Sequence, residues 1–113
     1  MDPTEINIAI ATACGWKDLS FSTNWLTRPD GKRLIFDACR ETWENFVPDY
    51  YNDLNAMHEV EKSLLKSERD RYNLALTEVV TGYALLSFES AAISATAPQR
   101  CKAFLMVQGL WKD

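Results

Sequence analysis

The segment WLTRPDGKRLIF (25–36) constrains the fold more than any other part of this 113-residue sequence. Two runs rich in strand-forming residues flank a Pro-Asp-Gly turn, from Pro29 to Gly31, and this pattern is typical of a β-hairpin. We therefore expect a small antiparallel sheet made of this hairpin, with room for one or two further strands. The side chains expected to face the helices are Trp25, Leu34 and Phe36.

Helix start signals open and close the chain. Asp2 precedes Glu5 by three residues, as in a capping box, and Pro3 suits the first helical position, so a helix is predicted over about 3–14. Near the other end, Thr96 begins a T-x-x-Q capping box. This second signal predicts a helix that continues to a glycine stop at position 109.

Two further helices are predicted in the middle of the chain. One runs over about 52–65, after an extended approach that begins at a proline. The next is expected to run over about 68–80, with Ser67 and Asp70 as its capping pair and Gly82 as its stop.

The predicted class is α+β, with the small antiparallel sheet covered by about four helices. Residues 1–113 are expected to form a single globular domain, since no linker, repeat or low-complexity tract interrupts them. Two segments carry no clear period. Residues 37–47 fit a short helix or a loop anchored by Trp43 and Phe46, and residues 83–94 fit a short strand or a packed loop.

The charge balance and the cysteines restrict the partners and the compartment. The formal net charge is −4, which argues against a nucleic acid as the main partner, because phosphate backbones require a basic face. Three cysteines, odd in number and far apart, indicate reduced thiols in a cytoplasm. No apolar run approaches the ~18 residues that span a bilayer, so no membrane partner is expected.

No catalytic or metal-binding motif stands out. His58 is the only histidine, and neither a nucleophile motif nor a second base accompanies it in the sequence. A zinc site of Cys14, Cys39, Cys101 and His58 would lack the closely spaced ligand pairs of structural zinc sites. Glycine-rich phosphate loops are absent as well. We therefore expect no enzyme, no metal and no cofactor.

The candidate binding residues gather around two predicted helix starts. Aromatic rings can stack on a base, amides can read its edge, and an arginine in the first turn of a helix suits a phosphate. The residues in question are Tyr50, Tyr51, Asn52, Asn55 and Arg100. The alternative interpretation is that the tyrosine pair covers the core and that Arg100 pairs with an acidic side chain.

Three sequence blocks carry a resemblance to a known group of proteins. They are ACGW (13–16), VPDYYNDLNAMHEVEKSL (47–64) and ATAPQRCKAFLMVQGLW (95–111). In order and spacing they resemble small, mostly uncharacterised proteins encoded by bacteriophages, and the resemblance covers about half of the chain. In layout the chain is more distantly similar to the phage αβα-sandwich domain.

The resemblance implies an accessory protein in the host bacterial cytoplasm that counters antiviral defence. By analogy with phage proteins that act as sponges, it would form a homo-oligomer and sequester a cyclic-nucleotide-type signal. One alternative is an anti-CRISPR-like inhibitor that binds a host defence protein. Its interface anchors would be exposed aromatic residues: Trp16, Trp25 and Tyr51. A structural or housekeeping phage protein is the other alternative.

Overall fold

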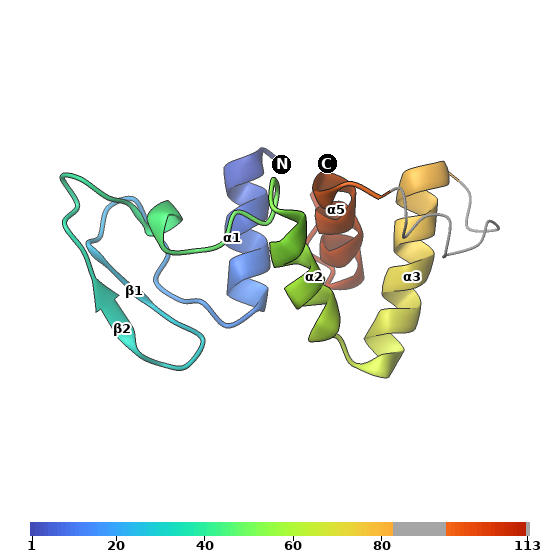
Figure 1. Cartoon of the computed structure of the whole chain (residues 1–113), viewed down its shortest axis with the longest axis horizontal. Coiled ribbons are helices and arrows are strands. Elements are labelled where there is room, and N and C mark those ends of the chain that lie inside the picture. The colour runs from blue at the N-terminus through green and yellow to red at the C-terminus, as the bar shows by residue number, and fades with distance from the viewer. Residues whose placement is uncertain (83–94, 113) are drawn as a thin grey trace.

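The computed structural model describes residues 1–82 and 95–112. In this part of the chain, four α-helices accompany a two-stranded antiparallel sheet, so the predicted α+β class is confirmed (Figure 1). The elements in order are α1 (Pro3–Ala13), β1 (Trp25–Thr27), β2 (Arg33–Ile35), the 3-10 helix η1 (Trp43–Asn45), α2 (Leu54–Lys62), α3 (Lys66–Thr81) and α5 (Ala97–Val107). The predicted strand or loop at 83–94 lies outside the described residues.

Helix α5 is the centre of the helical part, because it packs against α1, α2 and α3. Its inward side chains Cys101, Leu105 and Phe104 are buried. The predicted capping box opens it: Thr96 Oγ1 accepts a hydrogen bond from the N–H of Gln99, and Gln99 Oε1 accepts one from the N–H of Thr96. Arg100, near the start of α5, bonds to Glu61 of α2, so this end of α5 lies beside the candidate site.

The hairpin lies to the side of α1, at the far end of the molecule from α3 (Figure 1). Trp25 pairs with Ile35 and Leu26 with Leu34, and an isolated bridge joins Lys17 to Thr27 on the other edge of β1. Leu26 is fully buried, whereas 36% of Trp25 is exposed. The prediction that Trp25 faces the helices is therefore wrong, because neighbouring residues of a strand point to opposite faces.

The segment after the hairpin forms η1 and anchors the hairpin to the core. Trp43 is buried as predicted, and the ring of Phe46 packs on the ring of Phe36 with centroids 5.2 Å apart. Leu26 and Phe36 join the same cluster of buried residues as the inward side chains of the four helices.

The two middle helices differ from their predicted bounds. Asp53 is the N-cap of α2 and accepts hydrogen bonds from Asn55 N–H and the next amide, so α2 starts two residues later than predicted. Helix α3 starts before the predicted Ser67–Asp70 pair, because the side chain of Glu68 accepts a hydrogen bond from the backbone N–H at position 65. Gly82 ends α3 in the left-handed conformation, as predicted.

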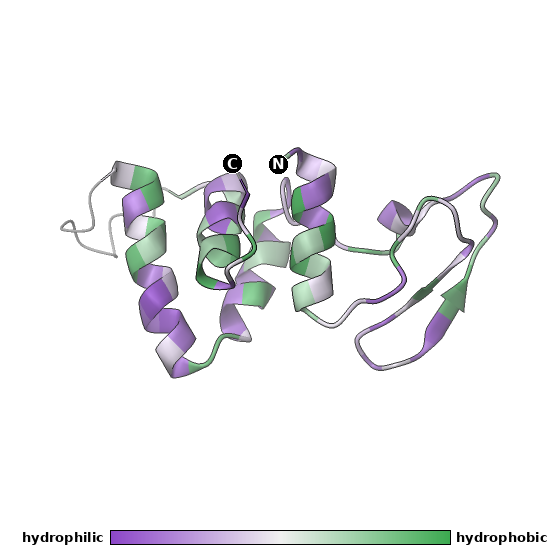
Figure 2. Ribbon diagram, turned by 180° about the vertical axis from the view of Figure 1, so that it is seen from behind, coloured by the Kyte–Doolittle hydropathy of each residue, from purple (hydrophilic) through white to green (hydrophobic). Residues whose placement is uncertain are grey.

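The helices are short relative to a lipid bilayer. In the described parts of the chain, no helix has both the length and the apolar character needed to cross a membrane. The longest of them, α3, has a hydrophilic N-terminal half (Figure 2). That half forms one wall of the cleft described next.

Candidate functional site

A cleft of about 570 Å³ lies between α2 and the first half of α3. It is lined by Asn55, His58, Glu59, Glu61 and Lys62 from α2, by Leu64 from the connection, and by Arg69, Tyr72 and Asn73 from α3. Spacings of three and four residues place these side chains on one face of each helix. Charged, amide and aromatic groups therefore meet in one concave surface.

The carboxylate of Glu61 organises the cleft. Its Oε1 lies 2.9 Å from Nδ1 of His58, and its Oε2 accepts hydrogen bonds from Nη1 of Arg100 at 2.8 Å and from the hydroxyl of Tyr72 at 2.5 Å. These partners come from α2, α5 and α3. One side chain thus ties three helices together at the base of the cleft.

Burial makes these contacts strong. The side chain of Arg100 is 6% exposed and that of Glu61 is 17% exposed, so water screens their attraction poorly. Arg100 also donates from Nε to the backbone oxygen of Ala95. Burial, followed by the hydrogen bond to Glu61 and its negative charge, raises the pKa of Tyr72 well above its usual value. The phenol therefore stays protonated and remains a donor.

The mouth of the cleft carries one positive charge that no described carboxylate balances. Lys62 pairs with Glu59 at 3.0 Å, and both side chains are largely exposed. Arg69 is exposed and donates from Nη2 to the backbone oxygen of Glu61 at 3.3 Å. In the described residues no acidic side chain lies within ion-pair distance of Arg69. Its guanidinium can therefore bind an anion.

Two of the five residues predicted to bind a ligand belong to this region. Asn55 lines the cleft. Arg100 lies behind Glu61, and its charge is balanced there, which agrees with the alternative interpretation given for it above. An ion pair that is already formed and buried gives Arg100 little capacity to bind a phosphate.

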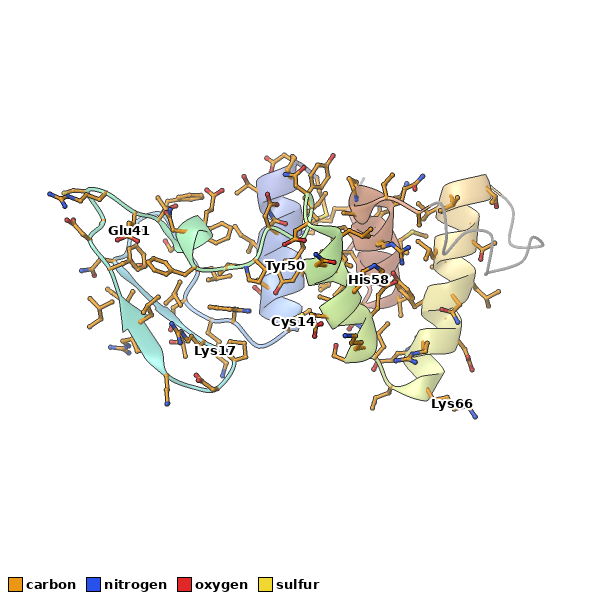
Figure 3. All side chains as sticks on the ribbon, viewed as in Figure 1. Cys14, Lys17, Glu41, Tyr50, His58 and Lys66 are labelled. Carbon is orange, nitrogen blue, oxygen red and sulfur yellow. The ribbon has the colours of Figure 1, made fainter. Side chains whose placement is uncertain are left out.

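The other three lie elsewhere. Tyr50 is buried where α1 and α2 meet, close to Cys14, as Figure 3 shows, and burial raises the pKa of its phenol. Tyr51 is half-buried, and its N–H donates to Oδ1 of Asn7. Asn52 lines a separate cavity of about 170 Å³ near the start of α1. In the described structure the five residues do not share one cavity, because Asn55 lines the cleft, Asn52 lines the smaller cavity, and neither tyrosine is among the lining residues of either one.

The three aromatic residues named as possible interface anchors are exposed to different degrees. Trp16 and Tyr51 are half-buried, whereas Trp25 stands on the open face of the hairpin. They do not form one patch on the same element, since Trp16 follows α1, Trp25 lies in β1 and Tyr51 precedes α2.

The smaller cavity has polar groups that are already satisfied. Asp49 accepts hydrogen bonds from Nδ2 of Asn7 at 2.9 Å and from Nδ2 of Asn52 at 3.0 Å. These two bonds lower the pKa of Asp49 below its usual value. The arrangement joins α1 to the approach to α2, so we interpret it as structural.

Asp49→Ala is expected to lower the free energy of unfolding at pH 7 by about 0.5 to 1 kcal/mol, because two exposed hydrogen bonds are lost. A carboxylate with a lowered pKa stabilises the fold above its unfolded-state pKa, and this stabilisation disappears as the pH falls through the folded-state pKa. The difference from wild type should therefore shrink below about pH 4 in urea titrations. Glu44→Ala, an exposed carboxylate on η1, is the control and should be neutral. A difference that persists unchanged at pH 2.5 would contradict this account.

Comparisons with known proteins add no second example of this cleft. No family model matches the chain, and neither a curated protein nor a solved structure matches it. The side chains that line the cleft are therefore the basis for inferring what it binds.

Proposed function

We propose that the α2–α3 cleft binds a small nucleotide-like anion and that the protein sequesters this molecule without converting it. The observation that carries the proposal is Arg69, whose charge no described carboxylate balances at the mouth of a cleft. A guanidinium in this position favours a phosphate group, because two parallel N–H groups fit two phosphate oxygens.

The other cleft side chains suit the remainder of a nucleotide. Asn55 and Asn73 each offer an amide donor and an amide acceptor, which can read the polar edge of a base. Leu64 adds an apolar surface. His58 uses Nδ1 toward Glu61, which leaves Nε2 for a ligand. A phosphate, a base edge and an apolar ring face each have a counterpart in the cleft.

The arrangement of Glu61 favours binding over catalysis. Its two carboxylate oxygens already contact His58, Arg100 and Tyr72. A general base needs a lone pair directed at a substrate proton, and Glu61 directs its lone pairs at the protein instead. In this proposal Glu61 fixes the positions of the cleft walls, and no residue acts as a nucleophile.

The biological setting of the proposal comes from the sequence resemblance to bacteriophage proteins. Within that setting, the sequestered molecule would be a cyclic-nucleotide-type signal of bacterial immunity in the host cytoplasm. A cleft of about 570 Å³ falls in the size range of small-molecule sites, which supports a ligand of this class.

Isothermal titration calorimetry tests the proposal with cyclic dinucleotides, cyclic trinucleotides and cyclic ADP-ribose isomers as probes. We expect saturable heat with at least one probe and the same amount of probe recovered unchanged by chromatography. No heat from any member of the panel would overturn the proposed binding, and a probe that is hydrolysed would overturn the sequestering role.

A further inference from the structure

Among the described residues that line the α2–α3 cleft, His58 is the one whose side chain changes charge near neutral pH. It lies on the side of α2 toward α3, and 44% of its side chain is exposed (Figure 3). Its Nδ1 lies 2.9 Å from Oε1 of Glu61, and in the described structure Nε2 has no hydrogen-bond partner. The imidazole ring therefore has one nitrogen left for a ligand.

The contact with Glu61 decides which nitrogen carries the hydrogen in the neutral ring. Arg100 holds Glu61 as a carboxylate, and a carboxylate accepts hydrogen bonds but cannot donate one. Nδ1 of His58 must therefore donate, and Nε2 of the neutral ring then carries only a lone pair. Because this lone pair repels a phosphate oxygen, neutral His58 cannot hold an anion.

A protonated ring has the opposite effect on an anion. Both nitrogens of an imidazolium are donors, so Nδ1 keeps its bond to Glu61 while Nε2–H can donate to a phosphate oxygen. Such a charge-assisted hydrogen bond is about twice as strong as a neutral one. The protonation state of His58 therefore determines whether it repels or binds a phosphate.

The charges around His58 come from three helices. The two ion pairs of the cleft balance their own charges. Tyr72 is neutral, because burial raises the pKa of its phenol. Arg69 is therefore the positive charge that opposes a proton on His58, and an anion bound to Arg69 removes this opposition. In the described residues the titratable groups near the ring are Glu59, Glu61 and Lys62 on α2, Arg69 and Tyr72 on α3, and Arg100 on α5.

We propose that His58 binds the ligand as an imidazolium and that it takes up a proton from the solvent when an anionic ligand enters the cleft. This assignment rests on the proposed ligand binding and adds a second phosphate contact beside Arg69. Both contacts involve the same residue, because Arg69 donates to the backbone oxygen of Glu61 and His58 bonds to its carboxylate.

The coupling between proton and ligand is reciprocal. A ligand that favours the protonated ring must bind more tightly at a pH where the ring is already protonated. We therefore expect the affinity to rise as the pH falls, by about fivefold to twentyfold between about pH 8 and about pH 6. One bound proton limits the change to about tenfold per pH unit.

Calorimetry in buffers of different ionisation enthalpy counts the protons directly. The probes are the cyclic dinucleotides, cyclic trinucleotides and cyclic ADP-ribose isomers, because phosphate monoesters titrate near pH 6 and would obscure the result. We expect an uptake of about 0.5 proton per bound probe at about pH 7. A purely structural role of His58 would produce no such uptake.

Two substitutions assign the proton to His58. His58→Gln removes the titratable group but keeps an amide that can donate to Glu61, so its affinity should be equal at both pH values, with no proton taken up. His58→Lys is positively charged throughout this pH range, so it should also take up no proton. At about pH 8 it should bind more tightly than His58→Gln. Urea unfolding of the same samples shows that both variants are folded.

The possible outcomes distinguish this inference from the proposed function. Binding by the wild-type chain without proton uptake, or with equal affinity at both pH values, would overturn the role of His58 and leave the proposed ligand binding intact. Tighter binding at the higher pH would also overturn it, because Nε2 would then accept a hydrogen bond from the base. Proton uptake that persists in both variants would assign the proton to another group. No heat from any probe at either pH would overturn the proposed function and this inference together.

Discussion

Replacing Glu61 with alanine is expected to lower the free energy of unfolding by about 3 kcal/mol. The substitution removes a carboxylate that contacts Arg100, Tyr72 and His58 at once, and hydrogen bonds to charged groups contribute about 1.5 to 3 kcal/mol each. Because Arg100 and Tyr72 are buried, water replaces the lost partner poorly. Urea unfolding followed by tryptophan fluorescence measures the change, and the melting temperature should fall by about 12 °C.

The matched control is Glu59→Ala, on the same helix and with the same change of side chain. Glu59 pairs with Lys62 at the surface, where ion pairs contribute less than about 1 kcal/mol, so the control should be close to neutral. Glu61→Gln keeps an acceptor but loses the charge, and its stability should fall between wild type and Glu61→Ala. If Glu61→Ala and Glu59→Ala are equally stable, Glu61 does not hold the helices together.

Arg69→Gln is expected to weaken binding of the active nucleotide probe by about tenfold to a hundredfold. The reason is the loss of a charge-assisted contact to phosphate, which contributes about 1.5 to 3 kcal/mol. The fold should not change, because Arg69 is exposed and makes one long hydrogen bond to a backbone oxygen. Calorimetry gives the affinity, and urea unfolding gives the stability of the same sample.

Arg71→Gln is the control for net charge. Arg71 is also exposed on α3, but it lies two residues beyond Arg69 and therefore on a different side of the helix. We expect its affinity to stay within about twofold of wild type. Equal losses from the two variants would mean that the overall charge of α3, and not a specific contact in the cleft, attracts the ligand.

Local signals in the sequence were sufficient to locate most of the elements. The cap at Asp2, the capping box at Thr96 and the stop at Gly82 act within one helical turn, so their residues are close in the sequence. The start of α3 was predicted too late because Ser67 and Asp70 have the spacing of a capping pair. In the structure the side chain of Glu68 instead caps the backbone N–H at position 65, two residues before Ser67. Two overlapping local signals competed, and only the packed structure distinguishes them.

The site was less accessible to sequence reasoning. Glu61 and Arg100 are 39 residues apart, and no local sequence pattern predicts which acidic side chain pairs with a buried arginine. One signal was present: Asn55, His58 and Lys62 follow helical spacing along one polar face of α2. The prediction that Trp25 faces the helices was wrong for a related reason. Alternation along a strand shows which residues share a face, but only the packed structure shows that the face of Leu26 is the buried one.

The most direct test of the proposed function is an amide NMR titration of ¹⁵N-labelled protein with the cyclic nucleotide probes. If the α2–α3 cleft binds the ligand, shifts should concentrate at the residues that line it, among them Asn55, His58, Arg69 and Asn73. The strands of the hairpin should not respond, since they lie at the opposite end of the molecule. Shifts confined to the hairpin, or no shifts with any probe, would contradict the assignment of the cleft as a nucleotide site.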